Sequence, residues 1–97
     1  MKLRFARQAK QDLDNIADYI REQNPEAALR VRAAIIRSLQ TLVLFPRIGR
    51  RQKVGGVRKL VTRRYKYLVY YVVNDSSEEI VILTIQHPAR EGEHSDA

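Results

Sequence analysis

The sequence contains no cysteine and no tryptophan, and only one methionine. Without cysteine the chain cannot form a disulfide and offers no thiolate for catalysis or for binding zinc. Small secreted domains often depend on disulfides, so this absence favours a reducing cytoplasm. The first five residues lack the apolar core of a signal peptide, and the longest apolar run, Leu68 to Val73, is far shorter than the roughly 20 residues that cross a bilayer. We therefore expect a cytoplasmic protein with no membrane partner.

Acidic residues are missing from the middle of the chain. None of the 11 lies between Ala27 and Asn74, a stretch that carries 12 Lys or Arg, and the formal net charge of the whole chain is +7. One explanation is a solvated basic face that only aids solubility. We favour an anionic partner, because a long stretch of one sign repels itself and also attracts anions. Nucleic acid and an acidic protein segment both fit this requirement.

The sequence also has few residues that bind metals and lacks the known phosphate-binding and nucleophile motifs. His87 and His94 are the only histidines and there is no cysteine, so no metal site is expected. Gly55 and Gly56 lack the other positions of a phosphate-binding loop, and no serine lies in a nucleophile elbow. We expect no cofactor. The remaining Arg, Lys, Tyr and His side chains can bind phosphates, or cleave RNA without a metal by using a general base, a cation and a general acid.

The spacing of apolar residues predicts six elements in a single domain of 97 residues. By residue number they are a strand at 2–5, helices at 7–23 and 25–44, and strands at 57–62, 65–73 and 80–86. Asn24 and Pro25 mark the start of the second helix and Pro46 its end, whereas residues 47–56 are expected to form a loop and 91–97 a flexible tail. The order is β-α-α-β-β-β. It predicts an α+β fold with a helical hairpin packed on a mostly antiparallel four-stranded sheet.

Four of the five tyrosines fall within the strand predicted at 65–73. The period of two places Tyr65, Tyr67 and Tyr71 on one face and Tyr70 on the other. A row of tyrosines can serve as a stacking platform for bases. We favour packing between the helices and the sheet for most of them, because aromatic side chains contribute large buried areas.

Three segments of the chain, taken in order, resemble the ParE/RelE superfamily of bacterial toxins from type II toxin–antitoxin modules. Residues 5–16 contain A-x-x-D-L-x-x-I, which looks like the family's strand followed by a helix. Residues 45–49 match the P-x-x-G that ends its second helix. Residues 57–90 are similar to the family's R-x-L, Y-x-x-x-Y-x-V and I-L-x-I-x-H-x-x-R series. The resemblance covers nearly the whole chain and implies the same β-α-α-β-β-β order.

The superfamily divides by mechanism. RelE-like members are ribosome-dependent mRNA endonucleases that cleave with strand cations and a C-terminal Tyr or His, whereas ParE-like members lack these groups and poison DNA gyrase. Aligned with the nucleases, the pair of strand lysines becomes Arg58 and Leu60, and Tyr67 stands where a catalytic Arg is expected. A second catalytic Arg aligns near Pro88, with Arg90 close by, and the C-terminal Tyr or His falls near His94. The missing cations favour the ParE-like branch.

This resemblance implies a growth-inhibiting toxin that binds DNA gyrase, has no catalytic residue, and is neutralised by a cognate antitoxin. The antitoxin's acidic C-terminal segment would wrap the toxin, and family complexes are often heterotetramers. The surface expected to bind target or antitoxin comprises Arg58, Lys59, Arg63, Arg64, Lys66 and Arg90. A second basic surface comprises the loop cations Arg50, Arg51 and Lys53.

Two other functions stay open. One is a metal-independent mRNA endoribonuclease that acts at the ribosome through Arg58, Arg90 and His94. The other is a nucleic-acid-binding module without chemistry. Arg58 and Arg90 also have a structural explanation, because an arginine beside the end of a sheet often holds a loop or a tail in place.

Overall fold

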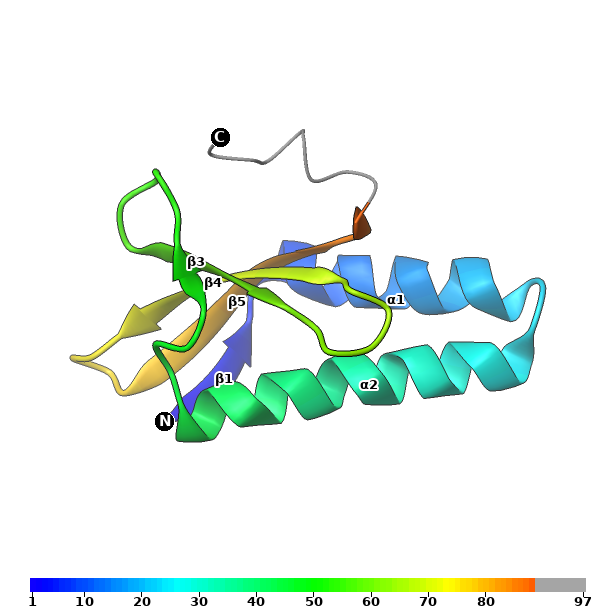
Figure 1. The fold of residues 1–97 in the computed structure, drawn as a ribbon, viewed down its shortest axis with the longest axis horizontal. Helices are drawn as coiled ribbons and strands as arrows, with labels where there is room; N and C mark the ends of the chain where they lie inside the picture. The colour runs from blue at the N-terminus through cyan, green and yellow to red at the C-terminus, as the bar shows by residue number, and fades with distance from the viewer. Residues whose placement is uncertain (89–97) are drawn as a thin grey trace.

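The computed structural model describes residues 1–88 of the chain (Figure 1). The elements follow in the order strand β1 (Lys2–Phe5), helix α1 (Arg7–Arg21), helix α2 (Pro25–Leu44), and strands β2 (Arg50–Arg51), β3 (Val57–Val61), β4 (Leu68–Asn74) and β5 (Glu79–Gln86). The strands form one sheet in the order β1-β5-β4-β3-β2. Strand β1 runs parallel to β5, and every other neighbouring pair is antiparallel. The α+β fold and the helical hairpin expected from the sequence are therefore confirmed.

The helical hairpin begins and ends where the sequence indicates. The side chain of Asn24 accepts a hydrogen bond of 3.1 Å from the backbone N–H of Ala27, and Pro25 occupies the first helical position. The cap satisfies one of the donors that every helix leaves free at its start. Both helices turn their buried side chains toward the same apolar core, which includes Leu13 of α1 and Ile35 of α2. In Figure 1 the connection between the helices and the β2–β3 loop lie at opposite ends of the molecule.

Strand β2 is an addition to the predicted four-stranded sheet. It lies inside the segment expected to form a loop, where Arg50 pairs with Lys59 and Arg51 pairs with Arg58. Two paired residues are too few to show the alternation that identifies a strand in a sequence. The pairing brings the loop cations beside the cations of β3.

The start of β4 differs from the prediction. Tyr65 and Lys66 have φ angles of 67° and 56° and belong to the turn before the strand, which begins at Leu68. Tyr65 therefore does not share a strand face with Tyr67 and Tyr71. These two are buried and pack in the core, as favoured for most of the tyrosines, whereas Tyr65 is 39% exposed.

Asp12 of α1 completes the edge of the sheet where β1 stops. The pairing of β1 with β5 ends at Ile82, so beyond that point β5 is paired with β4 on one side and has no partner strand on the other. One carboxylate oxygen of Asp12 accepts hydrogen bonds from the backbone N–H of Ile85 at 2.9 Å and from the hydroxyl of Thr84 at 2.5 Å. A backbone amide taken out of water needs a hydrogen-bond acceptor, and Asp12 supplies it. This contact is a structural reason for the Asp in the A-x-x-D-L motif.

Within residues 1–88, neither helix has the length and apolar content needed to span a membrane.

Candidate functional site

Most of the cations expected to bind a partner lie at the two ends of β3, with Arg47 beside them. The first group, which we call the loop cluster, contains Arg47, Arg50, Arg51, Lys53 and Arg58. The second, which we call the turn cluster, contains Arg63, Arg64 and Lys66. Strand β3 has five residues and so separates the groups by roughly 13 Å, and Figure 1 shows the β2–β3 and β3–β4 connections at opposite ends of this strand.

The structure thus places Arg58 beside the loop cations and apart from the turn cations with which the sequence grouped it. Lys59 lies between the two groups on β3, opposite Tyr70 of β4. Arg90 and His94 lie outside the described residues.

The turn cluster is held by a buried threonine. The hydroxyl of Thr62 donates a hydrogen bond of 2.6 Å to the carbonyl of Arg64 and accepts one of 3.0 Å from the backbone N–H of Tyr67. The backbone N–H of Thr62 also donates to the Tyr67 carbonyl at 2.9 Å. Thr62 is fully buried, whereas all four residues of the turn, numbers 63–66, are exposed. The hydrogen bonds fix the base of the turn and leave its cations in solvent.

Two consecutive residues of this turn adopt a conformation that side chains disfavour. Tyr65 and Lys66 both have left-handed φ angles, which cost on the order of 1–2 kcal/mol per residue outside glycine. The guanidinium carbon of Arg64 lies 5.4 Å from the centre of the Tyr65 ring, a cation–π contact. Backbone strain of this kind is concentrated at functional sites, and here it presents an arginine, a lysine and an aromatic ring together.

Arg58 performs the structural role that the sequence allowed for it. Its Nη1 donates hydrogen bonds to the carbonyl oxygens of Arg47 at 3.1 Å and Gly49 at 2.9 Å. The side chain is half-buried at the junction between the α2–β2 connection and the sheet. Arg58 therefore holds the connection in place, and part of its hydrogen-bonding capacity is used within the chain.

Gly49 lies against Tyr71, a contact that the sequence did not predict. The backbone N–H of Gly49 donates a hydrogen bond of 2.8 Å to the Tyr71 hydroxyl. A Cβ atom at position 49 would lie 2.6 Å from that hydroxyl oxygen, so only glycine fits. Burial raises the pKa of Tyr71, while the Gly49 hydrogen bond and the charges of Arg58 and Arg47 act in the opposite direction. The glycine that ends the P-x-x-G motif was the feature of the sequence that could have indicated this close contact.

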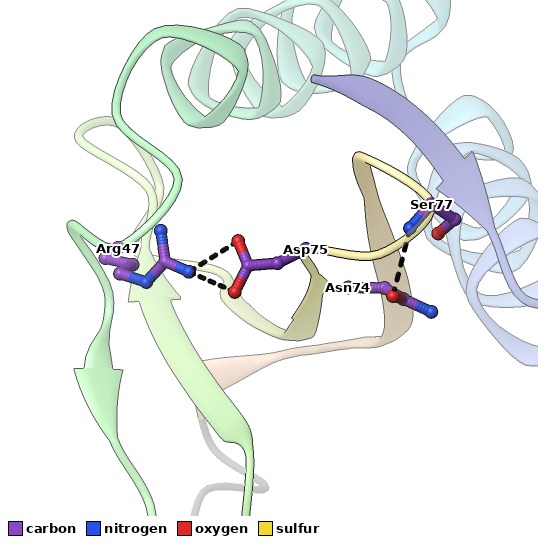
Figure 2. A network of polar contacts seen from close by, with 4 residues as sticks. All are labelled: Arg47, Asn74, Asp75 and Ser77. Carbon is purple, nitrogen blue, oxygen red and sulfur yellow. Dashed lines mark hydrogen bonds and ion pairs between the residues drawn. The ribbon is translucent and has the colours of Figure 1, made fainter.

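Arg47 connects the loop cluster to the turn between β4 and β5. Its Nη2 donates to both carboxylate oxygens of Asp75, at 2.7 and 2.6 Å, as Figure 2 shows. The same turn is closed by Asn74, whose side-chain oxygen accepts a hydrogen bond of 3.2 Å from the backbone N–H of Ser77. Sequence reasoning treated Arg47 only as part of the P-x-x-G motif and did not predict this ion pair.

The positions that would carry cations in a RelE-like nuclease are part of the apolar interior. Leu60 is half-buried and packs against the core, and Tyr67 is only 7% exposed. The ring of Tyr67 meets the ring of His87 edge-on at 5.6 Å, and burial raises the pKa of the Tyr67 hydroxyl. Beside this pair, a cleft of about 580 Å³ between α1 and the end of β5 includes Asp12 and Asn15 in its lining. Residues 1–88 contain no group of three or more side chains suited to binding a metal ion.

Comparison with known proteins gives three findings. Residues 3–92 match the family model described as the ParE toxin of the type II toxin–antitoxin system parDE. Y4kP of Sinorhizobium fredii, named as a candidate toxin, is 33% identical over 86 residues, which cover 89% of this chain and 86% of that protein. A chain of the chromosomal ParDE system from P. aeruginosa has a TM-score of 0.78 and 33% identity, covering 90% of this chain and 95% of its own.

The fold also occurs in a more distant group of proteins. A chain of the E. coli RelBE toxin–antitoxin complex superposes with a TM-score of 0.64 at 18% identity, and the match covers 89% of this chain and 94% of that chain. At this identity the likeness concerns the fold alone.

Proposed function

The chain belongs to the ParE toxin family of type II toxin–antitoxin systems, and from this we propose that it stops growth by binding DNA gyrase through the turn cluster. In this proposal the toxin acts by binding and breaks no phosphodiester bond itself. The exposed cations Arg63, Arg64 and Lys66 make the main contact, and Lys59 extends it along β3.

The observation that carries the proposal is the placement of Leu60 and Tyr67. Cleavage of RNA without a metal needs cations that are positioned around the charge of the pentacoordinate phosphorus. At these two positions the chain has an aliphatic side chain against the core and a buried tyrosine. Arg58, the cation at the other position of the aligned lysine pair, has Nη1 bound to two carbonyl groups. These contacts support a surface that binds and does not cut.

We also propose that a cognate antitoxin neutralises the toxin in the cytoplasm by means of an acidic segment. The P. aeruginosa relative belongs to a ParDE toxin–antitoxin system. The stretch without acidic residues and the net charge of +7 would attract an acidic segment over a distance. Apolar contacts made after encounter would then hold the complex together.

A supercoiling assay with purified gyrase tests the proposal. The wild-type chain is expected to inhibit the supercoiling of relaxed plasmid. The triple variant Arg63→Gln/Arg64→Gln/Lys66→Gln should need at least about ten times more protein for the same effect, which corresponds to about 1.4 kcal/mol of lost binding. No inhibition by the wild type, even at a large molar excess over gyrase, would contradict the proposal.

The matched control removes the same charge from a different surface. Arg30, Arg32 and Arg37 are exposed on α2, and changing all three to Gln lowers the net charge equally. This variant is expected to inhibit about as well as the wild type. Equal loss of inhibition in both triple variants would mean that net charge, and not the turn cluster, determines the effect.

The two other functions give different results. Cleavage of a transcript at the ribosomal A site in a translation extract, lost in His94→Ala, would establish the nuclease instead. DNA binding that falls steeply with salt, without growth arrest on expression, would indicate a nucleic-acid-binding module.

A further inference from the structure

We infer that a hollow beside the β2–β3 hairpin is a binding site for a carboxylate side chain of an acidic peptide segment in a protein partner. The hollow has a volume of about 320 Å³. Its lining includes three arginines of the loop cluster, Arg47, Arg51 and Arg58. Gln52, Gly55 and Gly56 also line it. The inference rests on the proposed antitoxin and specifies where an acidic residue of that partner would bind.

The three arginines differ in how far they are already engaged. Arg47 uses Nη2 for Asp75, and Arg58 uses Nη1 for two backbone carbonyls. Arg51 is exposed and has no ion pair or side-chain hydrogen bond within the described part of the chain. Each guanidinium carries five N–H donors, so the fixed arginines retain donors and Arg51 retains all of its own. Among residues 1–88 no acidic residue lines the hollow, and Asp75, the partner of Arg47, is not part of the lining.

Gln52 indicates that the ligand also brings a hydrogen-bond donor. Its side-chain nitrogen donates to the carbonyl of Arg50 at 2.9 Å, while its side-chain oxygen is buried without a partner in residues 1–88. A buried acceptor without a partner costs stability, so a ligand donor toward which the Gln52 side chain turns on binding would be favourable. A peptide carries backbone N–H groups next to its carboxylates. A DNA phosphodiester has no such donor. A ligand that must bring both a negative charge and a hydrogen-bond donor is therefore better matched by a peptide.

The surroundings of the hollow also fit a protein segment. A Cβ added at Gly55 or Gly56 would meet no atom within 4 Å, so the approach is open on this side. Next to Arg47 in the chain, Leu44, Phe45 and Ile48 are 74%, 58% and 55% exposed. Exposed apolar side chains grouped around an arginine are typical of protein interfaces. An acidic segment with apolar residues beside its carboxylate would use both features.

An NMR titration of the full-length, ¹⁵N-labelled chain tests the site. One probe is a capped peptide of alternating leucine and glutamate with three negative charges, and the other is tetrathymidylate, whose three phosphodiesters carry the same charge. The peptide is expected to shift the backbone amide signals of Gln52, Gly55 and Gly56 to saturation. Tetrathymidylate should bind more weakly there.

Two single-charge variants make the test specific. Arg51→Gln is expected to weaken peptide binding about ten-fold, the effect of losing one charge-assisted hydrogen bond. Arg32→Gln, which removes an exposed charge from α2, should change it less than about two-fold.

Three results would overturn the inference. They are a peptide that leaves the three amide signals unmoved, equal weakening of binding by both variants, and tighter binding of tetrathymidylate than of the peptide at the same amides. The last result would assign the hollow to nucleic-acid phosphate. The titration uses the isolated chain, so its failure leaves gyrase inhibition untouched, and a failed supercoiling assay leaves the titration untouched.

Discussion

Replacing Gly49 by alanine is expected to destabilise the fold strongly. The new Cβ would lie 2.6 Å from the Tyr71 hydroxyl oxygen, 2.7 Å from a carbon of the same ring and 3.0 Å from the carbonyl oxygen of Lys59. Tyr71 is completely buried and cannot swing away, and the Lys59 carbonyl belongs to the sheet. The connection must therefore move. That movement also weakens the hydrogen bonds of Gly49 with the Tyr71 hydroxyl and with Arg58, which measure 2.8 and 2.9 Å.

The expected loss follows from these contacts. Forcing an extra carbon into a packed interior costs about 1–3 kcal/mol, and a lost hydrogen bond adds about 1 kcal/mol. We therefore expect the free energy of unfolding to fall by about 2–4 kcal/mol, which for a domain of this size lowers Tm by roughly 10–25 °C. Urea denaturation followed by circular dichroism measures the first value, and thermal denaturation measures the second.

Two further variants control this prediction. Gly55→Ala adds a Cβ in open space, so the free energy of unfolding should change by no more than about 0.5 kcal/mol. Tyr71→Phe removes the hydroxyl, and Gly49→Ala should then cost less than in the wild-type background, because the two residues are in contact. If Gly49→Ala is as stable as Gly55→Ala, the close approach of Gly49 to Tyr71 is refuted.

Two more predictions concern the interior. Asp12→Ala leaves the backbone N–H of Ile85 without a partner and should lower the free energy of unfolding, measured by urea denaturation, by about 1–3 kcal/mol. The control Asp14→Ala, at an exposed position, should change it by no more than about 0.5 kcal/mol. Equal effects of the two variants would contradict the role of Asp12 at the sheet edge. Burial raises the pKa of Tyr67 and Tyr71 above the ordinary 10.0, so the stability these residues contribute is complete below that pH and is lost as pH rises through their higher folded values. In a titration of tyrosinate absorbance, the phenylalanine double variant should lack the late-ionising component of the wild type. A wild type without that component would contradict the burial.

Much of the fold was accessible from the sequence because local patterns and tertiary packing agree. Asn24, Pro25 and Pro46 mark the bounds of α2 through backbone chemistry that acts within a few residues. The contacts that determine the surface are of a different kind. Arg47 and Asp75 are 28 residues apart, and nothing in the sequence around either one indicates the other.

The candidate site was predictable in composition and less so in arrangement. The stretch without acidic residues identified the cations, and the resemblance pointed to Leu60 and Tyr67 as departures from the nuclease pattern. The division into a loop cluster and a turn cluster depends on β2 and on the left-handed Lys66, which follow from tertiary pairing and not from periodicity. Arg58 could be assigned to the α2–β2 connection only once its two carbonyl partners were known.

The target of the toxin is tested most directly by following two quantities in the same cells after expression is induced. These are the superhelical density of a reporter plasmid and the rate of protein synthesis. Binding to gyrase predicts that the plasmid relaxes first, while synthesis continues and transcripts stay intact. Synthesis that stops while the plasmid remains supercoiled, with transcripts cut at the ribosomal A site, would contradict the account.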